Sequence, residues 1–243
     1  MSQRFLLILM ALLFTSGPII SQASHHEDLS QEVSHHYAHN KDVKIHYVKA
    51  GSGPLVVMVH GFPDYWYSWR HQMNGLKKDF TVVAMDQRGY NRSDQPGGVE
   101  SYAMHNLVSD VIAVIRDTGA TQATVVGHDW GGAVAWQVAF NAPEVVQNLV
   151  ILNLPHPNGM ARELANNPEQ QRNSAYARRF IEGSAEDPDI MFGGPMNPQT
   201  LARWVQDPAA KVLYEAAFAR SSFNGMLNFY KAKYTRAGKH STV

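Results

Sequence analysis

The sequence contains no cysteine and no excess of charge, with 21 basic and 21 acidic side chains among its 243 residues. Without cysteine no disulfide can form, so the core must stabilise the fold. A neutral balance provides no basic field that would attract nucleic acid or an anionic membrane surface. Low-complexity segments and internal repeats are also lacking. The composition, 44% hydrophobic, is that of a globular protein with one large domain.

Long apolar runs are scarce, and the longest, residues 5–14, lies near the N-terminus behind Arg4. This run is too short for a membrane span, which takes roughly 20 apolar residues. The small residues Ser21 and Ala23 fit a cleavage after Ala23, which completes the layout of a secretory signal peptide. We therefore expect residues 1–23 to be a signal peptide, the protein to be secreted or periplasmic, and stable membrane insertion to be absent. A retained membrane anchor is the alternative.

The segment after the signal peptide is polar and rich in histidine. Paired histidines at 25–26 and 35–36 could suggest a metal site, but neither cysteine nor regularly spaced carboxylates accompany them. A solvated tail explains this composition better, and no metal is expected. Residues 33–38 and 43–49, separated by a polar segment, predict an antiparallel hairpin.

Continuous apolar runs alternate with helical patterns in the first half of the chain. The runs at residues 55–59, 81–85, 123–126 and 149–152 are typical of strands buried on both faces of a parallel sheet. Residues 102–118 and 133–141 predict helices between the later strands. This alternation indicates an α/β fold with a mostly parallel sheet and helices on both faces.

The strand pattern stops after residue 154. Residues 160–234 predict several helices, interrupted by the prolines at 168, 195 and 208. We expect residues 24–154 to form the N-terminal part of an α/β core, residues 155–235 a helical lid, and residues 236–243 a tail.

The segment most informative about chemistry is residues 127–132 (GHDWGG), which passes from a strand into a helix. A nucleophile elbow has small residues two positions before and after the nucleophile, because its sharp turn leaves no room for Cβ atoms there. Here Gly127 and Gly131 are the small residues, and the central one is Asp129. A carboxylate is an adequate nucleophile toward a strained or activated sp³ carbon. The alternative is a glycine turn with Asp129 as a helix N-cap.

A second segment, residues 60–63 (HGFP), follows the first buried strand, where this kind of fold places an oxyanion-hole loop. The backbone N–H groups of Phe62 and Trp130 could stabilise the charge on the Asp129 carbonyl oxygen during ester hydrolysis. We expect His60 to be a structural hydrogen-bonding residue and not a base.

Three motifs together closely resemble the epoxide hydrolase branch of the α/β-hydrolases, near relatives of the haloalkane dehalogenases. They are residues 60–63, residues 86–94 (DQRGYNRSD) and residues 127–132, in that order. The resemblance spans about residues 35–235. It implies an α/β-hydrolase fold and an epoxide and water as reactants, without a metal or organic cofactor.

The resemblance also implies two lid tyrosines that protonate the departing epoxide oxygen. Residues 228–231 (NFYK) resemble the motif of one, Tyr230, and Tyr176 resembles the other. Asp129 would then open the epoxide through an alkyl-enzyme ester, whose hydrolysis gives a diol.

Haloalkane dehalogenation is the alternative for an aspartate nucleophile in this family. Dehalogenases bind the halide with N–H donors, commonly the tryptophan after the nucleophile and an asparagine or a second tryptophan. Trp130 is present, but position 62 is Phe and no motif marks Trp204 as a donor. Two tyrosines also suit an alkoxide better than a halide.

The hydrolysis step requires a general base, which in this family is a histidine oriented by a carboxylate after later strands. The sequence ends 13 residues after Tyr230 and no strand-like run follows the lid. Residues 153–156 (NLPH) offer no carboxylate, and none of His128, His156 and His240 suits the position of the base. We therefore expect a C-terminally truncated chain that lacks the last strands and is impaired in ester hydrolysis. A relative that only binds small apolar ligands is the other possibility. An uncovered sheet edge at residues 149–152 would favour self-association.

Overall fold

A single six-stranded sheet organises residues 29–235, which are the residues that the computed structural model describes. The strand order is β1-β2-β4-β3-β5-β6. The strands are β1 (Ser34–Asn40), β2 (Val43–Ala50), β3 (Leu55–Val59), β4 (Thr81–Met85), β5 (Ala123–His128) and β6 (Val146–Leu152).

The sheet is antiparallel at one side and parallel through the rest. β1 pairs with β2 as an antiparallel hairpin, as the sequence predicted, and β2 pairs antiparallel with β4. The remaining pairs, β4 with β3, β3 with β5 and β5 with β6, are parallel. All five residues of β3 are buried, which explains why its sequence is continuously apolar.

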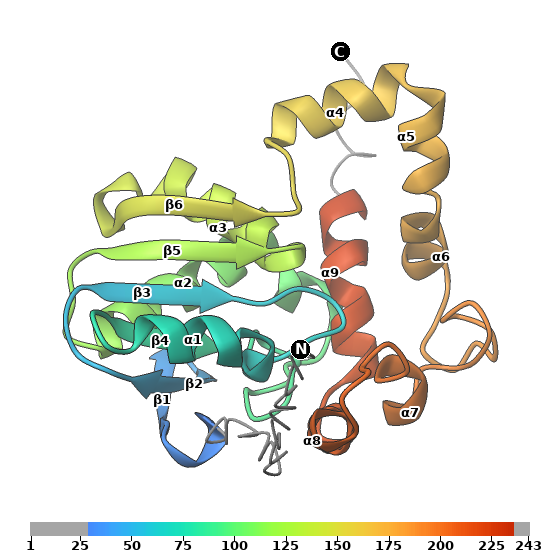
Figure 1. The fold of residues 1–243 in the computed structure, drawn as a ribbon. Coiled ribbons are helices and arrows are strands. Elements are labelled where there is room, and N and C mark those ends of the chain that lie inside the picture. The colour runs from blue at the N-terminus through green and yellow to red at the C-terminus, as the bar shows by residue number, and fades with distance from the viewer. Residues whose placement is uncertain (1–28, 236–243) are drawn as a thin grey trace, which may run out of the picture.

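Helices cover both faces of the sheet (Figure 1). Helix α1 (Arg70–Leu76) lies on one face, and α2 (Met104–Asp117) and α3 (Trp130–Asn141) lie on the other. The fold is therefore the predicted α/β architecture. The sequence analysis did not identify α1 or the 3₁₀ turn before it. The 3₁₀ turns are η1 (Leu29–Gln31), η2 (Trp66–Trp69), η3 (Val99–Tyr102) and η4 (Pro143–Val145).

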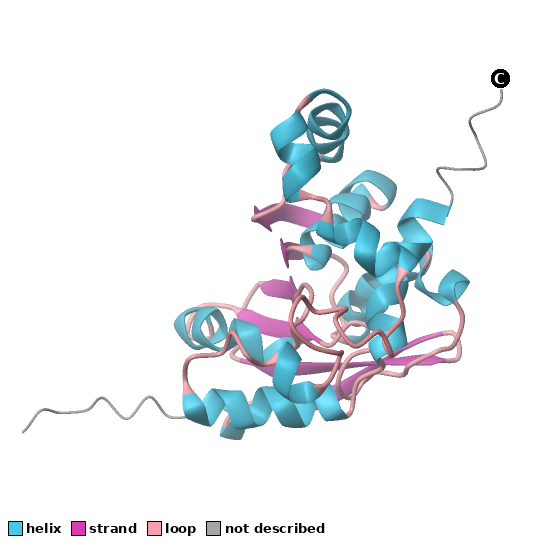
Figure 2. Ribbon diagram, turned by 90° about the vertical axis from the view of Figure 1, so that its right-hand side faces the viewer, coloured by secondary structure: helices cyan, strands magenta, loops and turns pink. Residues whose placement is uncertain are grey.

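In the described part of the chain, six helices follow β6 and lie beside the carboxyl ends of β3, β5 and β6 (Figure 1). They are α4 (Pro157–Asn166), α5 (Pro168–Asn173), α6 (Tyr176–Glu182), α7 (Pro198–Leu201), α8 (Pro208–Ala219) and α9 (Phe223–Thr235). Figure 2 turns this side of the molecule toward the viewer. Two of the predicted breaks coincide with helix starts, since the side chains of Asn167 and Asp207 cap α5 and α8. The exact lid boundaries, residues 155–235, stay a prediction.

The helices after β6 differ in how firmly they are packed. α8 buries Tyr214 and Phe218 among other residues, whereas α4 and α5 have no buried residue. Burial of large side chains is the main source of packing energy. We therefore infer that α8 is anchored to the core and that α4 and α5 are held more weakly.

Strand β6 forms one edge of the described sheet. Its side chains Val150 and Leu152 are 44% and 38% exposed, and Phe140 of the adjacent α3 is 48% exposed. An exposed apolar strand edge can pair with another chain. Self-association through this edge stays a prediction.

The predicted signal peptide and tail lie outside the described residues. Within residues 29–235, no helix is long and apolar enough to cross a bilayer.

Candidate active site

The segment between β5 and α3 has the sharp turn that the motif predicted. Asp129 has φ 52° and ψ −122°, a backbone conformation that is unfavourable for a residue with a side chain. A Cβ atom at Gly127 would lie 2.3 Å from the Gly131 carbonyl oxygen, and one at Gly131 would lie 2.0 Å from that of Val59. These contacts are with backbone atoms, which cannot move aside, so the turn requires both glycines.

The Asp129 side chain does not cap α3, although Asp129 is the residue that precedes the helix. Its Oδ1 instead accepts a hydrogen bond of 2.8 Å from the Phe62 backbone N–H. This contact is possible because residue 61 is glycine: a Cβ there would lie 2.4 Å from the Asp129 Cβ. The alternative of a simple N-cap is therefore wrong, and the carboxylate faces one of the two expected oxyanion donors.

His60 explains how the Phe62 amide is oriented. Its Nε2 lies 3.0 Å from the Gln87 backbone N–H, which can only donate, so Nε2 accepts and Nδ1 carries the hydrogen. Nδ1 then donates to the Gly61 carbonyl oxygen, 2.8 Å away. Since a peptide unit is planar, fixing the Gly61 carbonyl also fixes the Phe62 N–H, which points the opposite way.

Burial keeps His60 neutral in this role. Desolvation lowers the pKa of the fully buried imidazole to about 4. A neutral imidazole can serve as donor and acceptor at once, as the two contacts require. His60 is thus the structural hydrogen-bonding residue that the sequence suggested.

A cavity of about 260 Å³ opens in front of Asp129 and has mostly apolar walls. The four other residues to which the sequence analysis assigned a role lie close to Asp129. Trp130, Tyr176 and Tyr230 line the cavity, and the backbone N–H of Phe62 contacts Asp129. The further lining residues are Met104, Ala133, Gln137, Leu154, Pro155, Pro157, Met160, Ala161, Leu164, Ser174 and Ala177.

Edge-to-face contacts between aromatic rings hold the lid side of the cavity together. The Tyr230 ring contacts those of Phe62 and Trp130, with centroids 5.6 and 5.0 Å apart, in edge-on geometry. Tyr230 and Tyr176 also lie edge to face, at 6.4 Å. Tyr230 is 4% exposed and Tyr176 is 43% exposed. The two tyrosines therefore share one cavity, but only Tyr230 is firmly buried.

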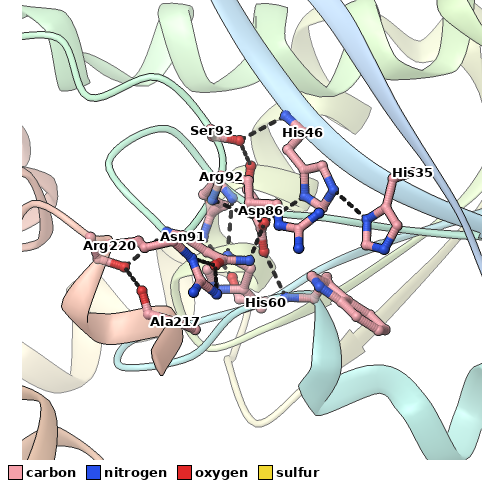
Figure 3. Close-up of polar contacts among 12 residues, drawn as sticks. His35, His46, His60, Asp86, Asn91, Arg92, Ser93, Ala217 and Arg220 are labelled. Carbon is pink, nitrogen blue, oxygen red and sulfur yellow. Dashed lines mark hydrogen bonds and ion pairs between the residues drawn. The ribbon is translucent and has the colours of Figure 1, made fainter. Parts of the chain in front are cut away.

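The second motif, residues 86–94, forms a network of polar contacts that includes His46 of β2 and Arg220 (Figure 3). The buried Asp86 accepts hydrogen bonds from His46 Nδ1 at 2.6 Å, from the Trp66 backbone N–H at 3.0 Å and from Asn91 Nδ2 at 2.8 Å. Burial alone would raise the pKa of Asp86, but the hydrogen bond and charge of His46 outweigh it and lower the pKa. Asp86 therefore connects strand β2 of the hairpin to the 3₁₀ turn η2 and to Asn91.

This network also reaches the helices after β6. The Arg220 guanidinium donates to Asn91 Oδ1 at 2.8 Å, and Asn91 contacts Asp86 (Figure 3). Arg88 in the same motif forms a buried bidentate pair with Asp110 of α2, with both N···O distances 2.6 Å. The motif thus ties lid, sheet and α2 together.

Comparison with known proteins agrees with this architecture. The model of a family described as "alpha/beta hydrolase fold" matches residues 54–232. The chain belongs to the α/β-hydrolase fold family. Within it, the sequence and structural similarities place the chain in the epoxide hydrolase branch.

Curated relatives in this α/β-hydrolase branch include epoxide hydrolase 4 of Mus musculus, 40% identical over 147 residues, or 59% of this chain. Bifunctional epoxide hydrolase 2 of Sus scrofa is 32% identical over 233 residues, or 82% of this chain. The chain spans 41% and 42% of the lengths of these two proteins.

A solved epoxide hydrolase of Bacillus megaterium, in complex with an inhibitor, is similar over 81% of this chain and 71% of its own, with a TM-score of 0.73 and 37% identity. Epoxide hydrolase VrEH1 of Vigna radiata gives a TM-score of 0.68 at 29% identity, over 87% of this chain and 74% of its own.

The residues considered for other roles lie elsewhere in this α/β-hydrolase. Trp204 is 48% exposed and packs on Tyr214, and it is not among the residues that line the cavity. His156 packs edge-on against Trp136 and Phe140 of α3, at 4.9 and 5.5 Å. Within the described residues, no histidine lines the cavity.

The sequence analysis missed much of the cavity wall. Gln137 lies one helical turn beyond Ala133 on α3, and Met160 and Leu164 lie one turn apart on α4. The i, i+4 spacing of these residues was visible in the sequence. Which face of α4 turns toward Asp129 depends on lid packing, and no local pattern specifies that.

Proposed function

We propose that the chain is an epoxide-opening α/β-hydrolase whose nucleophile is Asp129. The observation that carries the proposal is the position of Asp129. It occupies a strained elbow, its Oδ1 faces the Phe62 amide, and it shares a cavity with Tyr176 and Tyr230. The names of the relatives support an epoxide as the substrate class.

In the first half-reaction the Asp129 carboxylate attacks a ring carbon of the epoxide. A C–O ester bond forms, the ring C–O bond breaks and its electron pair passes to the epoxide oxygen. The Tyr176 and Tyr230 hydroxyls stabilise the alkoxide and supply its proton. Because all atoms of the epoxide are retained, the ester adds the full mass of the epoxide to the protein.

In the second half-reaction water attacks the carbonyl carbon of the ester and forms a tetrahedral intermediate. Its collapse breaks the bond between that carbon and the alkoxy oxygen, which releases the diol and restores the Asp129 carboxylate. One proton of the water passes to the diol, and the other restores the tyrosine hydroxyl that was deprotonated in the first half-reaction. Oδ1, which already faces the Phe62 N–H, is the oxygen that takes up the negative charge. The Phe62 and Trp130 amides form the oxyanion hole in this proposal. Backbone donors held in advance are effective because they need no reorganisation during the reaction.

The second half-reaction also requires a general base that activates the water. The lining residues of the cavity in the described part include no histidine, and a general base typically contributes about 10²–10⁴-fold. We infer that this chain, studied by itself, forms the ester much faster than it hydrolyses it.

Two alternatives define the test. The exposed position of Trp204 provides no second halide donor at the cavity, which disfavours dehalogenation. A protein that only binds small apolar ligands would have the cavity without the chemistry.

Export with cleavage after Ala23 is a separate proposal. The mass of the N-terminal peptide of the protein recovered from its host would test it.

The experiment is a single-turnover measurement with the protein in excess over an aryl epoxide. Loss of epoxide should be slower by roughly tenfold or more in Tyr230→Phe and in Tyr176→Phe, since each removes a proton donor. Tyr102→Phe is a matched control, because its buried hydroxyl has no hydrogen-bond partner among the described residues. Consumption of a chloroalkane but not of an epoxide would favour the dehalogenase. Consumption of neither would favour a binding protein.

A further inference from the structure

Asp64 is a buried carboxyl group that the proposed reaction does not use. It lies two residues after Phe62, in the loop that supplies the oxyanion amide, and is 8% exposed. It is not among the lining residues of the cavity. A buried carboxyl group is costly unless its hydrogen bonds are satisfied, so its contacts indicate why it is tolerated.

Oδ1 of Asp64 accepts two hydrogen bonds. The Tyr65 backbone N–H donates at 3.0 Å, within the loop itself. The Tyr214 hydroxyl donates at 2.9 Å, from helix α8, which lies 150 residues further along the chain. The Asp64–Tyr214 bond therefore connects the oxyanion loop directly to the lid.

Aromatic rings shield this bond from water. The Tyr214 ring lies edge-on to Tyr65, with centroids 4.9 Å apart, and to Trp204 at 5.3 Å. Tyr214 itself is 2% exposed. A hydrogen bond in such dry surroundings is stronger than one at the surface, and loss of either partner leaves a buried polar group unpaired.

The same surroundings make Asp64 sensitive to pH. Burial raises the pKa of Asp64 to about 7, against the opposing effects of the Tyr65 and Tyr214 hydrogen bonds, the Ser68 side chain and the Arg70 charge. The pKa of the buried Tyr90 is raised mainly by burial, and the charge of Asp64 adds to this effect.

Phe62 receives lid contacts on its other side. Its ring packs on Phe180 of α6 at 5.2 Å and on Tyr230 of α9 at 5.6 Å. The loop is thus held from three lid helices, and α8 holds it by a directional hydrogen bond from Tyr214 to Asp64. The position of α8 and the position of the Phe62 amide are for this reason coupled through Asp64.

We propose that Asp64 is a positioning residue, which fixes helix α8 of the lid to the oxyanion loop through Tyr214 and so holds the Phe62 amide on Asp129. The catalytic part of this inference rests on the proposed function. The structural part does not, because the Phe62–Asp129 hydrogen bond exists whatever the substrate.

The primary test measures hydrogen exchange of the Phe62 amide in the 243-residue protein. Tyr214→Phe removes only the donor, and Asp64→Ala removes the acceptor. Each should speed exchange at Phe62 and in residues 208–219 by roughly tenfold, the effect of one lost hydrogen bond to a carboxylate. Asp64→Asn keeps an acceptor oxygen and should stay within about twofold of the wild type. Tyr102→Phe, a buried tyrosine without a hydroxyl partner among the described residues, is the control and should change neither segment.

The kinetic test separates this inference from the proposed function. The rate of single-turnover epoxide loss should fall in Tyr214→Phe and in Asp64→Ala. In Asp64→Asn it should stay close to that of the wild type. Unchanged Phe62 exchange in folded Tyr214→Phe protein would overturn the inference, even if wild-type protein opens epoxides. If wild-type protein opens no epoxide but Phe62 exchange responds as expected, the proposed function fails and the positioning contact stands.

Discussion

The two walls of the cavity are built in different ways. The core wall, made by Asp129, Trp130 and Ala133, consists of the turn before α3 and the first residues of that helix, whose backbone packs closely against that of β3. The lid wall, made by Met160, Leu164 and Tyr176, belongs to helices that bury little, and Tyr176 is 43% exposed. Backbone contacts fix the position of the nucleophile, whereas contacts between side chains position the lid wall. The chemistry is therefore specified more tightly than the shape of the substrate pocket.

The largest expected effect tests the core wall. Gly131→Ala should destabilise the protein by roughly 3 kcal/mol or more, because its Cβ would lie 2.0 Å from a backbone oxygen of Val59. Gly75→Ala is the matched control: Gly75 lies in α1 with open space around it, so alanine should stabilise by about 0.4–1 kcal/mol. Urea unfolding measures both, and equal effects would refute the inference that backbone contacts fix the turn of the core wall.

A smaller effect concerns the contact of Asp64, in the oxyanion loop, with Tyr214 of helix α8. The pKa of Asp64 rises from 3.8 to about 7 on folding, so between these pH values the folded protein holds a proton that the unfolded chain has released. The free energy of unfolding should therefore fall as the pH rises, by up to about 1.4 kcal/mol per pH unit. Asp64→Asn cannot ionise and should be more stable than the wild type at pH 8 by roughly 1–3 kcal/mol. Parallel stability curves of the two proteins from pH 4 to pH 8 would contradict this.

The glycines and the aspartate show why the core wall could be predicted from the sequence. The turn is constrained by contacts close to Gly127, Asp129 and Gly131, so a short sequence motif is enough to predict its backbone geometry. The four parallel strands and the hairpin were likewise visible as local patterns, and the structure confirms them. The expected burial on both faces is wrong for β6, which has no buried residue because it lies at the edge of the described sheet.

The lid wall and the Asp64 contact could not be predicted in this way. Asp64 and Tyr214 are 150 residues apart, and neither belongs to a motif that indicates their contact. Helix α1 was missed for a related reason: its seven residues include a single buried one, Met73, so no apolar periodicity marks it. The assigned roles of Asp129, Tyr176, Tyr230, Phe62 and Trp130 stay predictions, although the structure brings these residues together.

A still smaller effect is expected within the lid. Leu164→Ala on α4 should change the free energy of unfolding by less than about 1 kcal/mol, because α4 has no buried residue. Leu201→Ala, at a fully buried position of α7, should cost roughly 2–5 kcal/mol. Thermal denaturation compares the two variants, and a large loss for Leu164→Ala would show that the lid wall is as firmly built as the core wall.

The smallest effect on stability concerns the sheet edge. Val150→Lys on β6 should change the free energy of unfolding by less than about 0.5 kcal/mol, since Val150 is 44% exposed. It should nevertheless reduce the self-association that we predict for the chain, because a charge on an edge strand opposes pairing with another strand. Sedimentation velocity of the wild type and the variant measures this, and a monomeric wild type would refute the prediction.

The most direct test of the account is the intact mass of the 243-residue protein after incubation with an aryl epoxide. The account predicts a single adduct equal to the mass of the whole epoxide, located on Asp129 by peptide mapping and absent in Asp129→Asn. The adduct should persist, because hydrolysis of the ester lacks a base at the cavity among the described residues. Diol formation over many turnovers without a detectable adduct, or an adduct that survives in Asp129→Asn, would contradict it.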